Sequence, residues 1–169
     1  MQEGYHGADV EGRLTECLPV FSTQRRLLMP NSDLVVVIVD DNVAESRLMS
    51  EVLKENIPDM QVHTFKDCQD ALNAFQDYSI YDVPHVVVLD HRMPQMNGTE
   101  LLSILSAHAN FSDIPMIVWT GYLDRQVEKQ CIDEGALMVR SKPRNFQEYC
   151  NFAKEITYIA QHAQAQIME

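Results

Sequence analysis

The sequence predicts an α/β fold with a doubly wound, five-stranded parallel sheet, arranged as a (βα)5 three-layer sandwich. Two observations lead to this fold class. Five apolar segments recur along the chain, and the strongest are continuous rather than alternating, which indicates strands that are covered on both faces. A helical pattern of apolar residues follows each segment. Right-handed crossovers would then place helices on both faces of a single sheet.

Each expected strand is a short apolar segment. The first, third and fourth are the most apolar and are rich in β-branched residues, whereas the second and fifth are weaker. In chain order the expected strands are Leu34–Val39, Gln61–Phe65, His85–Leu89, Met116–Trp119 and Ala136–Val139. The lengths suit strands of a buried sheet better than helices.

The expected helices are recognised by apolar residues that recur at helical spacing. Gly98 precedes the third helix, and Gly135 is expected to end the fourth, since glycine commonly follows the last helical turn. The apolar faces, helix by helix, are Ala44, Leu48, Val52, Leu53 and Ile57; Ala71, Leu72 and Phe75; Leu101, Leu102 and Leu105; Val127 and Cys131; and Tyr149, Phe152, Ile156, Ile159 and Ala163.

Length and composition suit one globular domain, which we place at residues 33–165. Residues 1–32 lack a clear period and are interpreted as an N-terminal extension that is docked in part, disordered or foreign to the native chain. The net charge of -12 argues against a nucleic-acid-binding surface. There is no basic, then apolar, N-terminal leader and no stretch long enough to enter a membrane. We therefore expect a cytoplasmic protein.

Polar and charged residues follow the expected strands, where a doubly wound sheet binds its ligands. Asp40 and Asp41 follow the first strand, Asp90 the third, Thr120 the fourth, and Lys142 comes shortly after the fifth. Each has an ordinary interpretation by itself, such as capping of the first helix by Asp41 or its neighbour. Together, three carboxylates repel one another unless a cation neutralises them, and oxygen ligands favour Mg²⁺. A lysine and a hydroxyl beside them favour a phosphoryl group.

These residues stand in motifs that resemble the receiver domains of two-component response regulators, the CheY-like superfamily. The resemblance rests on Asp40-Asp41, on the D-x-x-M-P-x-M-[DN]-G stretch from Asp90 to Gly98, on Trp119-Thr120-Gly121 and on Lys142-Pro143. It covers about Leu34 to Ala160 and implies the fold class that the apolar pattern already predicts.

The resemblance also implies a role for each site residue. Asp90 is expected to be the phosphoacceptor. Asp41, Asp90 and the backbone carbonyl of Arg92 are expected to ligate Mg²⁺, with Asp40 acting directly or through water. Thr120 and Lys142 are expected to bind phosphoryl oxygens.

Three positions carry the remaining expectations. The peptide before Pro143 is cis in the family. Where the family usually has Tyr or Phe, three residues before the lysine, this sequence has Val139, so the usual coupling of threonine and aromatic ring is in doubt. Tyr122 and Arg92 are bulky and flank the expected phosphorylation site, either as neutral surface variation or as a control on water access.

The implied function is that of a stand-alone signalling module and not of an enzyme, beyond assisting its own phosphorylation and dephosphorylation. The donor would be a sensor histidine kinase or a histidine phosphotransfer protein, and output would pass through contacts with an unknown downstream protein; a homodimer is compatible with this. Two alternatives stay open. A haloacid-dehalogenase-type phosphatase would need D-x-D after the first strand, and a flavodoxin-like FMN binder would need a phosphate loop there.

Overall fold

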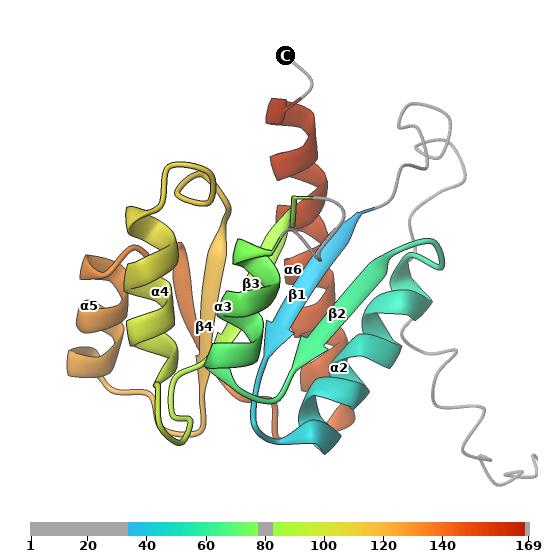
Figure 1. The fold of residues 1–169 in the computed structure, drawn as a ribbon. Helices are drawn as coiled ribbons and strands as arrows, with labels where there is room; N and C mark the ends of the chain where they lie inside the picture. The colour runs from blue at the N-terminus through green and yellow to red at the C-terminus, as the bar shows by residue number, and fades with distance from the viewer. Residues whose placement is uncertain (1–33, 78–82, 168–169) are drawn as a thin grey trace, which may run out of the picture.

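The structure, a computed structural model, describes residues 34–77 and 83–167, with side chains described to residue 163. The predicted extension at residues 1–32 lies outside them. In the described part of the chain, five strands alternate with five helices (Figure 1). In chain order they are β1 (Val35–Val39), α2 (Val43–Asn56), β2 (Gln61–Phe65), α3 (Cys68–Gln76), β3 (Val86–Asp90), α4 (Gly98–Ala107), β4 (Met116–Thr120), α5 (Arg125–Asp133), β5 (Met138–Ser141) and α6 (Phe146–Ile167).

The strands form one parallel sheet in the order β2-β1-β3-β4-β5. This order is doubly wound, because the chain moves from β1 to one edge and then returns past β1 to the other. The predicted fold class is confirmed. The switch in direction lies between β1 and β3, so their carboxyl ends flank the crevice in which such folds bind ligands.

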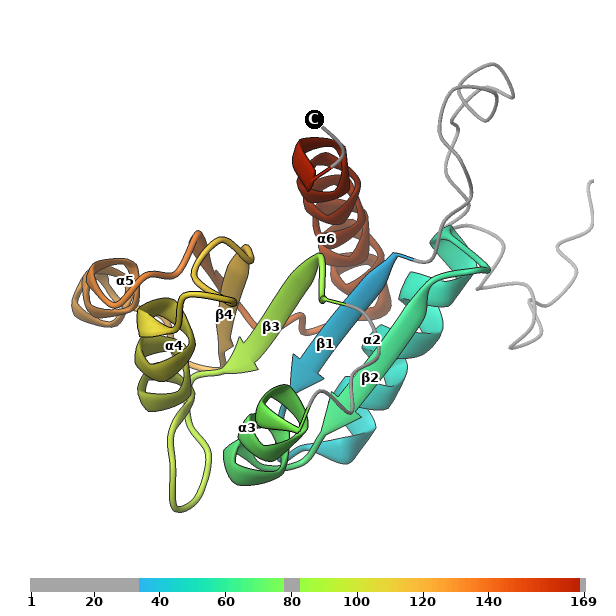
Figure 2. The same ribbon diagram turned by 45° about the horizontal axis from the view of Figure 1, so that its top comes forward.

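Helices cover both faces of the sheet (Figures 1 and 2). Val35, Val37 and Val39 of β1 pack in a core with residues of α3, α4 and α5. Val36 and Ile38 point the opposite way and pack with residues of α2 and α6. All five β1 residues are therefore buried, which is the physical reason for a continuous rather than alternating apolar run.

Three strands end later than the sequence indicated. β3 is shifted by one residue, to Val86–Asp90, β4 extends by one residue, to Thr120, and β5 runs from Met138 to Ser141 instead of from Ala136 to Val139. The parallel pairing continues to these ends, since Asp90 lies opposite Trp119 and Thr120 opposite Ser141. Asp90 and Thr120 are thus strand residues, held by the sheet rather than by a loop.

The buried face of α2 differs by part of a turn from the predicted one. Ala44 is exposed, whereas Met49, which the apolar pattern passed over, is fully buried together with Val52 and Leu53. The buried residues Ser46, Met49, Val52 and Leu53 recur at helical spacing and form the face that packs on the sheet, and Ala44 lies outside it. The predicted end of α5 is confirmed, because Gly135 follows it with a φ of 111°. No helix in the described part of the chain combines the length and apolar character needed to cross a bilayer.

Candidate functional site

Three aspartates meet at the carboxyl ends of β1 and β3. Asp40 follows β1 directly, Asp41 comes next, and Asp90 ends β3. One carboxylate oxygen from each lies within 4.8 Å of the other two. Asp40 and Asp90 are buried, with 0% and 4% of their surface exposed, whereas Asp41 is exposed. The convergence predicted from strand ends is therefore present.

A backbone hydrogen bond orients the Asp40 carboxylate, whereas the Asp41 carboxylate takes no part in capping α2. The amide of Asn42 donates to Asp40 Oδ1 at 2.7 Å. Asn42 in turn caps α2, because its side-chain oxygen accepts from the amides of Ala44 and Glu45 at 3.2 and 3.3 Å. Asn42, and not Asp41, is therefore the N-cap of α2, and capping does not explain why an aspartate stands at position 41.

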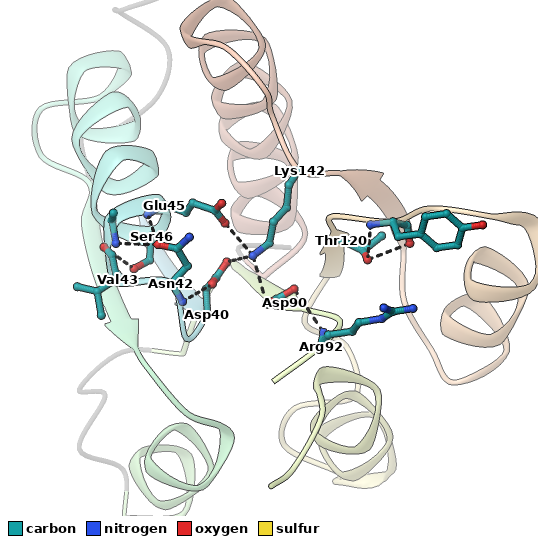
Figure 3. Close-up of polar contacts among 11 residues, drawn as sticks. Asp40, Asn42, Val43, Glu45, Ser46, Asp90, Arg92, Thr120 and Lys142 are labelled. Atoms are coloured by element: carbon teal, nitrogen blue, oxygen red, sulfur yellow. Dashed lines mark hydrogen bonds and ion pairs between the residues drawn. The ribbon is translucent and has the colours of Figure 1, made fainter. Parts of the chain in front are cut away.

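Lys142 reaches from the end of β5 into the middle of this cluster (Figure 3). Its Nζ lies 2.8 Å from Asp40 Oδ2, 2.8 Å from Glu45 Oε2 and 3.1 Å from Asp90 Oδ2. The same Nζ lies 5.3 Å from the centre of the Trp119 ring. One ammonium group therefore contacts carboxylates from three different parts of the chain.

The cluster holds more negative than positive charge. Burial raises the pKa of Asp40 to about 6, although the hydrogen bond from Lys142 acts against this shift. Burial also raises the pKa of Asp90, again opposed by Lys142. The pKa of Lys142 is raised as well: burial alone would lower it, but hydrogen bonds to Asp40 and Glu45 more than compensate. The site is thus disposed to take a further cation.

The loop after β3 returns closely to Asp90. The amide of Gly98 donates to the carbonyl of His91 at 3.3 Å. A Cβ atom at Gly98 would lie 1.9 Å from the backbone oxygen of Asp90, so a side chain there is sterically excluded. The amide of Arg92 approaches Asp90 Oδ1 at 3.4 Å. The glycine of the motif therefore allows the loop to close over the strand end.

Thr120 is buried at the end of β4, but its hydroxyl is bonded within its own loop. It donates to the carbonyl of Tyr122 at 3.1 Å and accepts from the Tyr122 amide at 3.3 Å. The Tyr122 side chain is 61% exposed. Val139 is buried in the core and pairs with Val118 of β4. The structure thus brings Thr120 to the site edge, with its hydroxyl satisfied by backbone.

The expectation of a cis peptide before Pro143 is wrong for this structure, in which the described residues contain no cis peptide bond. The trans form is the intrinsically preferred isomer of an X–Pro peptide. With the trans peptide the amide of Lys142 donates to the carbonyl of Thr120 at 2.8 Å, and the side chain still reaches the aspartates.

The donor set fits a hard divalent cation. Three carboxylates offer one oxygen each at mutually close positions, and oxygen ligands are those that Mg²⁺ prefers. Both Asp40 oxygens already have partners, in Asn42 and Lys142, whereas Asp41 is exposed and outside any capping role. Asp41 is therefore better placed to contact a metal directly than Asp40.

Residues 36–154 match the response regulator receiver domain family. The chain belongs to this family. Among curated relatives, the receiver is 29% identical over 108 residues to the cyclic di-GMP phosphodiesterase response regulator RpfG of Xanthomonas campestris and 30% identical over 93 residues to the response regulator Rcp1 of Synechocystis. The two alignments cover 64% and 53% of this chain, and 28% and 63% of the length of RpfG and Rcp1. The receiver is 25% identical to the two-component response regulator ORR3 of rice, covering 73% of the chain and 92% of ORR3.

Solved structures share the fold of this receiver. The Mn²⁺-bound form of Rcp1 has a TM-score of 0.65 at 25% identity and covers 73% of this chain and 91% of its own. The phosphorylated cyanobacterial phytochrome response regulator RcpA has a TM-score of 0.68 at 22% identity, with 74% and 91% covered. Family membership favours a signalling domain over the two alternative families, the dehalogenase-type phosphatases and the FMN binders.

One site residue escaped the sequence interpretation. Glu45 lies in the first turn of α2, where an acidic residue is common because of the helix dipole. Nothing in its spacing sets it apart from other glutamates. Only the three-dimensional contact with Lys142 identifies it.

Proposed function

We propose that this receiver accepts a phosphoryl group on Asp90 from a phosphohistidine and signals through protein contacts that depend on this modification. The observation that carries the proposal is the position of the Asp90 carboxylate. It ends a buried strand, lies 3.1 Å from the Lys142 ammonium, and shares its cluster with Asp40 and Asp41. Cation and carboxylate are thus assembled around a single candidate nucleophile.

The transfer step needs little rearrangement of this chain. An Asp90 carboxylate oxygen attacks the phosphorus of the phosphohistidine, the phosphorus–nitrogen bond breaks, and the imidazole leaves with the electron pair and takes up a proton. Lys142 binds a phosphoryl oxygen and neutralises its charge. Thr120 supplies a hydrogen bond to another oxygen once its hydroxyl leaves the backbone of Tyr122.

The same proposal includes a Mg²⁺ ion held by Asp41, Asp90 and the Arg92 carbonyl, with Asp40 acting directly or through water. Bound there, Mg²⁺ would supply positive charge to the phosphoryl oxygens. Burial raises the pKa values of Asp40 and Asp90 because it disfavours their charged forms, and a bound cation would favour those forms, which supports a cation at this place.

A sensor histidine kinase or a histidine phosphotransfer protein is the donor class that this chemistry requires. We propose that the receiver acts as a stand-alone module without catalysis of its own beyond turnover of its phosphoryl group. A cytoplasmic location fits the same proposal, since phosphorylation of the donor histidine depends on ATP.

The experiment compares Asp90→Asn with Asp59→Asn, a matched change at an exposed turn residue. Both proteins are incubated with acetyl phosphate and Mg²⁺, and incorporated phosphate is measured. We expect full loss of label in Asp90→Asn and wild-type labelling in Asp59→Asn. Wild-type labelling of Asp90→Asn would show that another residue accepts the phosphoryl group.

A further inference from the structure

We propose that Glu45 is a positioning residue that holds the Lys142 ammonium in place for phosphoryl transfer. The inference rests on the proposed function, because it concerns the same lysine. It adds a residue outside the set of Asp40, Asp41, Asp90 and Thr120 that the motifs assign.

Glu45 approaches Lys142 from a separate element. It lies in the first turn of α2, whereas Lys142 follows β5. Glu45 Oε2 and Lys142 Nζ are 2.8 Å apart, as close as the contact between Lys142 and Asp40. The Glu45 oxygen is buried and makes no other hydrogen bond in the described part of the chain. Its position is therefore defined by the lysine (Figure 3).

The number of donors on Lys142 explains why Glu45 matters. A lysine ammonium has three N–H groups, and three carboxylates surround this one. The phosphoryl group forms on Asp90, so only the donor aimed at Asp90 needs to change its partner. Glu45 and Asp40 can keep the other two donors and fix the ammonium while the third moves to a phosphoryl oxygen.

The Trp119 ring limits the ammonium on a further side. Its centre lies 5.3 Å from Nζ, and the residue is fully buried. A cation near an aromatic face is attracted to it. Without Glu45, the ammonium would keep Asp40, Asp90 and this ring as neighbours and would be free to turn about them. Trp119 is also the single tryptophan of the chain. Its fluorescence should therefore change when the Lys142 ammonium moves relative to its ring.

A simpler interpretation assigns Glu45 to the helix dipole alone. On that interpretation, removal of the carboxylate changes stability slightly and leaves Lys142 in place. A second interpretation is that the negative charge of Glu45 repels the incoming phosphoryl group. On that interpretation, Glu45→Ala and Glu45→Gln should both be phosphorylated faster than the wild type. Positioning instead requires an acceptor for Lys142, charged or neutral.

The test uses Glu45→Ala, which removes the acceptor, and Glu45→Gln, which keeps a neutral one. Glu51→Gln is the control, because it removes the same charge from the exposed side of the same helix, where Glu51 pairs with Arg47. The full chain is treated with acetyl phosphate and Mg²⁺ for the rate of phosphorylation. Trp119 fluorescence of the unphosphorylated proteins and their melting temperatures are recorded in parallel.

We expect phosphorylation of Glu45→Ala to slow about tenfold: a misplaced group can cost about a hundredfold in rate, but Asp40 still holds the ammonium in part. Glu45→Gln should recover most of the rate, and Glu51→Gln should match the wild type. Trp119 emission should change in Glu45→Ala without unfolding. Equal or faster rates in both Glu45 variants, or unchanged Trp119 emission, would overturn the positioning role. If the wild type itself takes no phosphate, the proposed function fails, and the Trp119 emission then tests the Lys142 contact alone.

Discussion

The two sides of the site are held together in different ways. On the acidic side, Lys142 links the ends of β1 and β3 to the start of α2 through contacts of 2.8 to 3.1 Å with three carboxylates, two of them buried. On the β4 side, the hydroxyl of Thr120 bonds to the backbone of Tyr122, only two residues away. One side is a long-range network of charges, and the other is a local turn.

This difference separates chemistry from response. On the acidic side, the Lys142 ammonium already lies beside Asp90, so it can stabilise the charge of a phosphoryl group without rearrangement. The β4 side must exchange one hydrogen bond for another, and such a local exchange requires little energy. Val139 is buried, and its small, stiff side chain has no aromatic ring that could change between exposed and buried positions. We therefore expect the structural response in residues 121–125, next to the Thr120 turn.

The largest expected effect on the acidic side comes from removing the carboxylate of Asp41, which does not cap α2. Asp41→Ala should abolish the Mg²⁺-dependent part of phosphorylation, because Asp41 is exposed and placed to contact a metal directly. Urea unfolding without metal should be unchanged, since Asn42 and not Asp41 caps α2. Phosphorylation is measured with acetyl phosphate in Mg²⁺ and in EDTA, with Asp59→Ala as control. Equal rates in Mg²⁺ and EDTA for the wild type would refute the metal site.

The second test removes the cation that joins the acidic side. Lys142→Met should lower the free energy of unfolding by about 3 kcal/mol, because Asp40 and Asp90 lose their buried counter-charge. The measurement is urea denaturation in EDTA. Lys129→Met is the matched control, since Lys129 pairs with Asp133 at the surface, where an ion pair has little effect on stability. A shared unfolding midpoint for both variants would mean that the Lys142 contacts are weak.

Added Mg²⁺ extends this test. If the metal binds beside Asp41 and Asp90, it should restore part of the stability that Lys142→Met loses, because a ligand that binds the folded state alone stabilises it. Asp41→Ala combined with Lys142→Met should show no such recovery. Recovery in the double variant would place the metal elsewhere.

The pH dependence of stability provides a smaller effect on the same side. Burial raises the pKa of Asp40 to about 6, above its ordinary value of 3.8. Between about pH 4 and pH 6, Asp40 is therefore protonated in the folded state and ionised in the unfolded chain. The stability contributed by that proton is fully present below about pH 4 and is lost as pH rises through about 6. Unfolding free energies in EDTA should fall over this range, and Asp40→Asn should flatten the slope. A slope unchanged in Asp40→Asn would assign it to other groups.

The fold and most of the acidic side could be predicted because they depend on local patterns. The continuous apolar run of β1 indicated burial on both faces, and residues after such runs must meet at one sheet edge. Asp40, Asp41, Asp90 and Lys142 follow from this rule without knowledge of any rotamer.

Other features depend on where side chains point, which a pattern does not show. Glu45 has the spacing of an ordinary first-turn acid, and only its contact across elements shows its role. The Thr120 hydroxyl could have faced Asp90 or its own loop, and the choice follows from turn geometry. Ala44 was expected in the core and is exposed, because the face of α2 that packs on the sheet is formed by Ser46, Met49, Val52 and Leu53.

The smallest expected effect concerns the β4 side. Tyr122→Ala keeps the backbone groups that bond Thr120 but removes a large, exposed ring from the same loop. If the ring limits the approach of water, phosphorylated Tyr122→Ala should lose its phosphate about threefold faster, equivalent to about 0.6 kcal/mol of barrier. Tyr158→Ala is the matched control, since Tyr158 on α6 is 60% exposed and Tyr122 is 61% exposed. The rate of phosphate loss is measured after removal of the donor, and hydrogen exchange of residues 121–125 is followed with and without beryllofluoride. Equal lifetimes for the two variants, together with unchanged exchange in residues 121–125, would show that the β4 side is as fixed as the acidic side.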